Sequence, residues 1–198
     1  MDGVEILRFA DVDEWDGWLD EYGGTRPDAW LAVVKKGAVT NGSAAAGLTA
    51  AEAGDVAICH GWIDSQRRAL DATHFLQRYS PRRPGSPWSR VNVERVAALE
   101  AAGRMRPAGR AQVAAAQADG RWAAAYAPQR TAAIPDDLAA ALAGNERARA
   151  AYDALSRSDR YAAFLPLLKA RTPGARARAL RRAVTALEAG SGDAGGGS

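Results

Sequence analysis

Hydrophobic residues in the first part of the chain follow two spacings, one typical of helices and one typical of strands. Between Asp11 and Tyr22 they recur every third or fourth position, which predicts an amphipathic helix that ends at Gly23. Its apolar stripe comprises Val12, Trp15, Trp18 and Leu19. Short apolar or alternating runs predict four strands, near residues 4–9, 29–35, 62–69 and 74–80.

A second helix is predicted to begin at Thr49, after a loop over residues 40–47. Thr49 and Glu52 have the spacing of a capping box, in which each side chain accepts a hydrogen bond from the other residue's backbone N–H. Gly61 suits the end of this helix, because glycine readily adopts the left-handed conformation found there. The runs near 62–69 and 74–80 flank the turn Leu70–Thr73, so they are expected to form a hairpin.

Three prolines separate these strands from a helical part. Pro81, Pro84 and Pro87 exclude a helix interior and a central strand, so this basic segment is expected to be extended and semi-rigid. From the cap residue Ser89 onward, every hydrophobic pattern has helical spacing. The six predicted helices are one from 89 to Gly103, one over 107–118, one marked by Leu138 and Leu142, one capped by Asn145, one beginning near Ser158 and one opening with Thr172-Pro173.

The last two of these helices contain informative residues. Pro166 is expected to kink or shorten the fifth helix, because it has no N–H to donate. The sixth places Leu180, Val184 and Leu187 inward, and its arginines on another face. Those arginines are Arg171, Arg178 and Arg182.

These elements predict an α+β protein with a small, mostly antiparallel sheet and two helices, followed by an all-helical C-terminal region. The sheet region is expected to span residues 1–88 and the helical region residues 89–190, with both packed as one unit. Residues 191–198 consist of Gly, Ser, Ala and one Asp, and are expected to form a flexible tail.

Charge is distributed unevenly along the 198 residues, although the net charge is only +3. Residues 1–60 contain 4 basic and 11 acidic side chains, whereas residues 61–198 contain 22 basic and 12 acidic ones. The two parts are therefore expected to attract each other. Nearly all of the positive charge is arginine, which suits planar recognition of phosphate or carboxylate. An equally weighted alternative is that the Ala- and Arg-rich composition reflects a GC-rich genome.

Several classes of protein are not indicated by the composition. The amino terminus lacks the basic and apolar regions of a signal peptide, and no apolar stretch is long enough to span a membrane, so we expect a cytoplasmic protein. A single cysteine, Cys59, excludes an internal disulfide. The two histidines lie far apart, so no metal site is predicted, and no cofactor is predicted either.

The strongest candidate for a binding site lies between residues 59 and 92, where aromatic, arginine and polar residues are concentrated. Such a mixture suits an anionic or planar ligand, or an unknown protein partner, bound in a groove between sheet and helices. The candidate residues are Trp62, Asp64, Arg82, Arg83, Trp88, Ser89 and Asn92. The structural alternative is that the tryptophans are core residues and that Asp64 forms a salt bridge with Arg67, Arg82 or Arg83.

Catalysis is the less favoured interpretation of this region. Cys59 beside His60 would suit a thiol nucleophile, but neighbouring side chains in a helix point in different directions, and free cysteine is usually buried. Asp64 or His60 remains an alternative proton-transfer group for a small anionic substrate. Nucleic-acid binding is a further alternative to which the excess of arginine would contribute, and it is not favoured because the acidic first sixty residues would neutralise much of that charge.

Several motifs together resemble the YdeI or OmpD-associated family, also described as bacteriocin-protection or OmdA-domain proteins. The resemblance covers nearly the whole chain except the tail. Its motifs are Leu48-Thr49 with Glu52-Ala53, Gly61 to Asp64, Pro81 to Arg83, Trp88-Ser89 with Asn92, Gly103 to Met105, Pro107 to Gly109, Asp119 to Trp122, and Ala125-Tyr126.

The C-terminal signature of that family is similar here at Ala170, Arg171, Pro173, Arg176 and Arg178, and differs at Gly174, Ala175 and Ala179. The resemblance implies a non-enzymatic stress-response protein that confers tolerance of antimicrobial peptides or bacteriocins. It also implies association with an outer-membrane porin, which the expected cytoplasmic location makes difficult to transfer to this chain.

Overall fold

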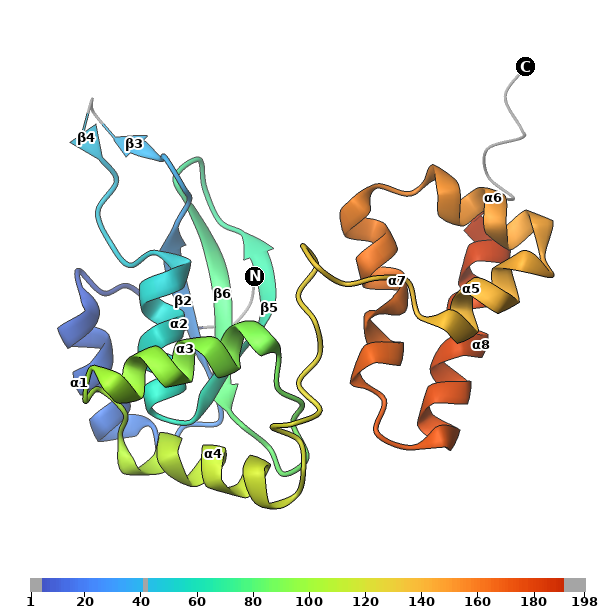
Figure 1. Cartoon of the computed structure of the whole chain (residues 1–198). Helices are drawn as coiled ribbons and strands as arrows, with labels where there is room; N and C mark the ends of the chain where they lie inside the picture. Colours follow the sequence, from blue (N-terminus) through green and yellow to red (C-terminus); the bar gives the residue numbers. More distant parts are fainter. Residues whose placement is uncertain (1–4, 41–42, 191–198) are drawn as a thin grey trace. The chain divides into compact units, whose positions relative to one another are not determined.

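A four-stranded sheet lies at the centre of the first part of the chain (Figure 1). The structure is a computed structural model that describes residues 5–40 and 43–190. The strands follow the spatial order β1 (Ile6–Leu7), β2 (Ala29–Val34), β6 (His74–Pro81) and β5 (Trp62–Ala69). β1 is parallel to β2, and the other neighbours are antiparallel. The predicted small, mostly antiparallel sheet is therefore confirmed.

Two predicted segments differ from the structure. The strand expected over residues 4–9 is β1, only Ile6–Leu7, and residue 4 lies outside the described residues. The loop expected over residues 40–47 includes part of a second small sheet, in which β3 (Val39–Thr40) pairs with β4 (Ser43–Ala44). Strands of two residues are too short to show the alternation from which strands are predicted.

Helices α1 (Val12–Tyr22) and α2 (Ala50–Cys59) pack on one face of the sheet. Each begins where its sequence supplies a cap. The Asp11 carboxylate accepts hydrogen bonds from the backbone N–H groups of residues 13 and 14, and Thr49 and Glu52 form the predicted capping box. Gly61 follows α2 with φ of 75°, a conformation that favours glycine. The buried core between helices and sheet includes Trp15, Leu19, Leu31, Val33, Val56, Trp62 and Tyr79.

The predicted hairpin of β5 and β6 is present, and a carboxylate holds its turn. Asp71 accepts hydrogen bonds from the backbone N–H groups of Thr73 at 2.8 Å and His74 at 2.7 Å. These two bonds favour the ionised form and lower the pKa of Asp71 to about 2. The pairing register shifts between Asp64 and Arg67, so β5 contains a bulge.

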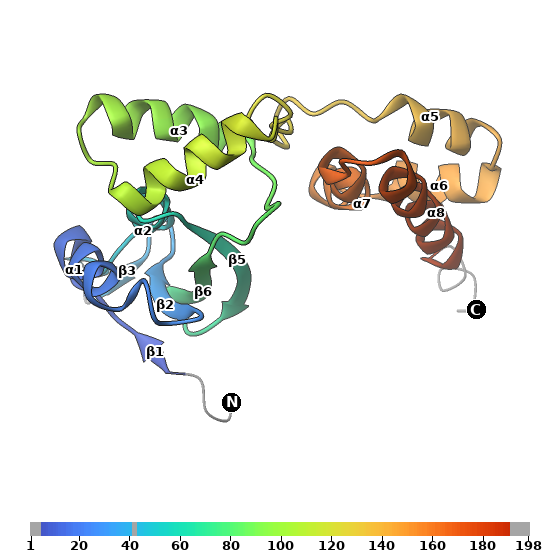
Figure 2. The same cartoon turned by 90° about the horizontal axis from the view of Figure 1, so that it is seen from below.

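Helices α3 (Arg90–Ala101) and α4 (Pro107–Ala118) lie over α2 on the side away from the sheet (Figure 2). They close a second cluster of buried residues around the end of α2, which includes Ile58, Cys59, Trp88, Val96, Leu99, Met105 and Ala116. Gly109 lets α4 approach α2 closely, because a Cβ atom there would lie 2.1 Å from the Cys59 carbonyl oxygen. That carbonyl accepts a hydrogen bond from the Arg106 N–H at 3.1 Å.

The chain divides into two compact units, residues 1–125 and 126–198. The change from strands to helices at Ser89 therefore falls inside the first unit. The expectation that all elements pack as one unit stays a prediction. In the second unit, α5 (Asp136–Ala143), α6 (Glu146–Ala154), α7 (Arg157–Lys169) and α8 (Pro173–Gly190) follow one another. α7 continues through Pro166 to Lys169, so the proline does not end the helix.

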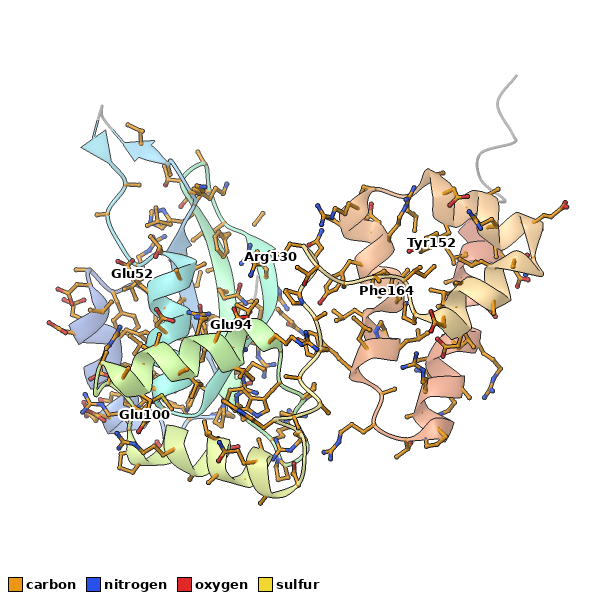
Figure 3. The ribbon with its side chains drawn as sticks, viewed as in Figure 1. Glu52, Glu94, Glu100, Arg130, Tyr152 and Phe164 are labelled. Carbon is orange, nitrogen blue, oxygen red and sulfur yellow. The ribbon has the colours of Figure 1, made fainter. Side chains whose placement is uncertain are left out.

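The second unit has its own hydrophobic core. Leu138 and Leu142 of α5, Tyr152 of α6, Phe164 and Leu167 of α7, and Leu187 of α8 are buried in it. Figure 3 labels Tyr152 and Phe164, which come from two consecutive helices and belong to this core. Within the described ranges, none of the helices combines the length and the apolar character needed to cross a lipid bilayer. The predicted tail, residues 191–198, lies outside them.

Candidate functional site

The two tryptophans predicted to line one groove lie in different hydrophobic clusters. Trp62 is 2% exposed in the core between sheet and helices, and its indole N–H donates to the carbonyl of Gly23 at 3.2 Å. Trp88 is 1% exposed beneath α3 and α4, with its ring centroid 5.0 Å from that of Trp122. Both indoles are therefore structural in the part of the chain described, and neither side chain is open to a ligand.

Arg82 is buried with Trp88. Its guanidinium carbon lies 3.6 Å from the centroid of the Trp88 ring, and Nη1 donates to the Pro87 carbonyl at 3.3 Å. The side chain is 4% exposed, which is unusual for arginine and is made tolerable by the aromatic face and the carbonyl. Both contacts join the beginning of the segment between β6 and α3 to its end, so Arg82 helps to fix the fold of this proline-rich segment.

The remaining predicted residues surround the beginning of α3 or lie on β5. Ser89 caps α3 by accepting a hydrogen bond from the Asn92 backbone N–H at 3.2 Å. Arg83 is exposed, and its backbone N–H donates to the Ser86 hydroxyl. Asp64 is exposed on β5 and, among the described residues, forms no ion pair with an arginine. The structure thus gathers Arg82, Arg83, Trp88, Ser89 and Asn92 and places Trp62 and Asp64 elsewhere; ligand binding by these residues stays a prediction.

A hollow of about 540 Å³ opens between α1, α2 and the segment that precedes α4. We call it the α1–α2 hollow; it is lined by Val12, Asp16, Glu52, Cys59, Arg104 and Arg106, among others. It brings together a thiol, carboxylates and guanidiniums, the residue types from which active sites are built. The protonation and hydrogen bonding of these side chains therefore indicate whether the hollow could act as an active site.

Asp16 is the centre of a charged network beside this hollow. One of its oxygens lies 2.8 Å from Nε2 of His60, and the other accepts a hydrogen bond from Nη2 of Arg106. Burial raises the pKa of Asp16, but the hydrogen bonds from Arg106 and His60 outweigh it and hold the pKa below its usual value. Asp20 adds a second carboxylate, 3.8 Å from Nδ1 of His60 and 3.7 Å from Arg106.

This network holds α1, the end of α2 and the residue before α4 together, and it leaves no side chain of the network well placed to transfer a proton to a ligand. Both ring nitrogens of His60 face carboxylates, and the residue is 8% exposed. Burial raises the pKa of the Cys59 thiol, so the reactive thiolate is disfavoured at neutral pH. Asp16 and Arg106 are ninety positions apart, which is why no spacing in the sequence indicated the pair. Across the described residues, no His, Cys, Asp or Glu cluster is arranged to hold a metal ion.

The second unit contains a larger groove, of about 730 Å³, between its last two helices. We call it the α7–α8 groove. Small or apolar residues form its walls: Ala162, Ala163 and Pro166 from α7, and Ala175, Ala179 and Ala186 from α8. Asp159, Arg178 and Arg182 complete the lining with charged groups. The spacing of Arg178 and Arg182 in the sequence predicted that they share one face of α8, but the alanines of the walls carry no pattern that predicts a groove.

Arg176, two positions before Arg178 on α8, has a different role. Its guanidinium donates two hydrogen bonds to Asp137, from Nε at 2.7 Å and from Nη2 at 2.9 Å. The pKa of Asp137 lies below its usual value, mainly because of these hydrogen bonds from Arg176. This bidentate pair joins α8 to the beginning of α5 and orients the face of α8 that carries Arg178 and Arg182.

Two family models match separate parts of the chain. Residues 7–112, more than half of the chain, match the model described as a domain of unknown function, DUF8412. Residues 131–190 match the model described as "Bacteriocin-protection, YdeI or OmpD-Associated", OmdA. No curated protein and no solved structure matches the chain.

The resemblance predicted from the sequence is confirmed for the C-terminal segment. It was expected over nearly the whole chain, whereas the OmdA match covers residues 131–190 only. Several motifs on which it was based, such as Gly61 to Asp64 and Trp88 to Asn92, lie within the segment that matches the other family model. The α7–α8 groove lies entirely inside the OmdA match.

Proposed function

The chain belongs to the DUF8412 family through residues 7–112, and we propose that it acts as a tolerance protein of the bacteriocin-protection type, by binding a partner and not by catalysing a reaction. The single observation that carries this proposal is the OmdA match of residues 131–190. That segment forms a compact part of the second unit with its own core. It also contains the largest of the hollows described above.

The chemistry of the α1–α2 hollow supports binding over turnover. A thiol nucleophile needs a lowered pKa, but burial raises that of Cys59. A general base needs a ring nitrogen directed at the substrate, but both nitrogens of His60 are directed at Asp16 and Asp20. These groups are used to hold α1, α2 and the segment before α4 together.

We place the proposed activity in the cytoplasm, as expected from the sequence, and in the α7–α8 groove. A concave site with mostly apolar walls and a few charged groups is the usual form of a binding site. The groove volume of about 730 Å³ falls within the usual range for such sites. The proposed partner is therefore a molecule with an apolar face and charges that meet Arg178 and Arg182.

A survival assay tests the proposal. The full chain is expressed in a bacterial strain that is sensitive to a bacteriocin, and the lowest inhibitory concentration is compared with that of the empty vector. We expect the wild-type chain to raise this concentration, and Ala162→Trp, which fills the groove from an exposed position, to lose most of the effect. Ala177→Trp places the same side chain at an exposed position outside the groove and serves as the control.

A second control addresses catalysis. Asp16→Asn with His60→Gln removes two titratable groups of the network and is expected to leave protection intact, provided that the circular dichroism of the variant is native. The proposal fails if the wild-type chain, expressed in soluble form, does not change survival. Loss of protection in the natively folded hollow variant would instead favour the enzymatic alternative.

A further inference from the structure

The α7–α8 groove is long enough to bind a third helix. Its lining on α8 runs from Ala175 to Leu187, a separation of twelve positions, or about 18 Å at the rise of an α-helix. On both helices the lining residues recur at helical spacing, so the walls are continuous. Alanine walls allow helix axes to approach to about 8 Å, and the large side chains of an incoming helix would fill the space that alanine leaves.

Charge on the groove is unbalanced. Arg178 and Arg182 are exposed and stand one turn apart on α8, and neither has a hydrogen bond or an ion pair within the part of the chain that the structure describes. The single acidic lining residue, Asp159, already accepts a hydrogen bond from the Ser156 hydroxyl at 2.6 Å at the start of α7. Residues 126–190 carry 11 basic and 6 acidic side chains, a net charge of +5.

We propose that the α7–α8 groove binds an acidic amphipathic helix of a partner protein, an inference that rests on the proposed function and specifies its partner. The apolar stripe of that helix lies on the alanine walls, and carboxylates one turn apart meet Arg178 and Arg182. A cationic peptide would place like charges opposite the two guanidiniums, which is unfavourable. Tolerance therefore arises from docking to an acidic partner and not from capture of a cationic toxin.

The probe is a synthetic helical peptide of about 15 residues, long enough to cover the groove. Leucines at every third and fourth position give it an apolar stripe, and glutamates flank the stripe. A second peptide has lysine in place of every glutamate. Binding to the fluorescently labelled peptides is measured with the full wild-type chain by anisotropy at two ionic strengths. We expect the acidic peptide to bind with Kd near 10 μM and more weakly at high salt, and the lysine peptide to bind at least about tenfold more weakly.

Three variants locate the bound peptide. Arg178→Glu with Arg182→Glu is expected to weaken the acidic peptide by about tenfold or more, since it replaces two attractions with two repulsions. Arg181→Glu changes a neighbouring exposed arginine that does not line the groove, and is expected to change Kd less than about twofold. Ala162→Trp is expected to weaken both charge states of the peptide by occlusion.

Several other outcomes overturn the inference. No binding of the acidic peptide, equal binding of the lysine peptide, or an effect of Arg181→Glu equal to that of the groove variants removes the charge argument. If anionic lipid vesicles bind through Arg178 and Arg182 and the peptide does not, this face of α8 binds a membrane surface and not a partner helix. Sedimentation that shows a dimer broken by Ala162→Trp assigns it to a second copy of the chain. Peptide binding without any effect on bacteriocin survival would contradict the proposed function and leave the docking site standing.

Discussion

Replacement of Gly109 by alanine tests the packing of α4 on α2. The added Cβ would lie 2.1 Å from the Cys59 carbonyl oxygen and 2.9 Å from that of Ile58. Both contacts are with backbone, so no side chain can rotate away, and α4 must move from α2. Such a shift also weakens the hydrogen bond from the Arg106 N–H to Cys59.

The expected cost follows from three contributions. Overpacking of this kind costs about 1–3 kcal/mol, and loss of one backbone hydrogen bond costs about 1 kcal/mol. Alanine is favoured over glycine in a helix by about 1 kcal/mol, which offsets part of the loss. We therefore expect Gly109→Ala to lower the free energy of unfolding by about 2 kcal/mol, equivalent to a fall of about 1 M in the urea midpoint.

Gly17 provides the matched control. It lies inside α1, and a Cβ there would meet nothing within 4 Å. Gly17→Ala is therefore expected to raise the free energy of unfolding by about 0.5–1 kcal/mol. The same glycine-to-alanine change is thus expected to lower the free energy of unfolding at position 109 and to raise it at position 17. The difference arises because only the Cβ atom at position 109 would meet the backbone of another element.

Tryptophan fluorescence in urea is a suitable assay, because all six tryptophans lie in residues 1–125 and report on the first unit alone. The reasoning is refuted if Gly109→Ala unfolds at the same or a higher urea concentration than the wild-type chain. It is also refuted if both glycine variants shift the midpoint in the same direction by similar amounts, since the effect would then be one of helix propensity.

Three further predictions concern single interactions. The pKa of Asp71, about 2 in place of its ordinary 3.8, lies below the unfolded value, so its stabilising effect is present above pH about 4 and is lost as the pH falls toward 2; a carboxyl NMR titration with a midpoint near 3.8 would contradict this. Arg176→Met, which breaks the pair with Asp137, is expected to lower the stability of the second unit by about 1 kcal/mol. The helical circular dichroism should then melt earlier while the tryptophan transition stays unchanged. Thr49→Ala removes the capping box of α2 and should cost about 1 kcal/mol, visible in tryptophan fluorescence; Thr49→Ser, which keeps the hydroxyl, should cost much less.

Local chemistry explains why so much of the fold could be predicted. The capping box at Thr49, the stop at Gly61 and the hairpin turn at Asp71 each depend on residues within four positions of one another. The predicted helices after Ser89 are similarly marked by spacing and caps. Where the pattern failed, in β3 and β4, the strands are too short to carry a pattern.

The candidate site could not be predicted because it depends on which distant residues meet. Trp62 and Trp88 lie within thirty residues of each other in the sequence, yet they are buried in different hydrophobic clusters. The pair between Asp16 and Arg106 joins residues that no local rule connects. The walls of the α7–α8 groove are alanines, which appear in the sequence as ordinary helix formers and become informative only when two such faces converge.

The edges of the main sheet have a consequence for behaviour at high concentration. Among the described residues, β1 at one edge contains two residues, and β5 at the other edge is bulged between Asp64 and Arg67 and bears Arg67 and Arg68. Neither edge offers the long, flat row of free amide groups on which identical chains stack into fibres. We therefore expect the protein to remain dispersed at high concentration, without edge-to-edge pairing of strands between molecules.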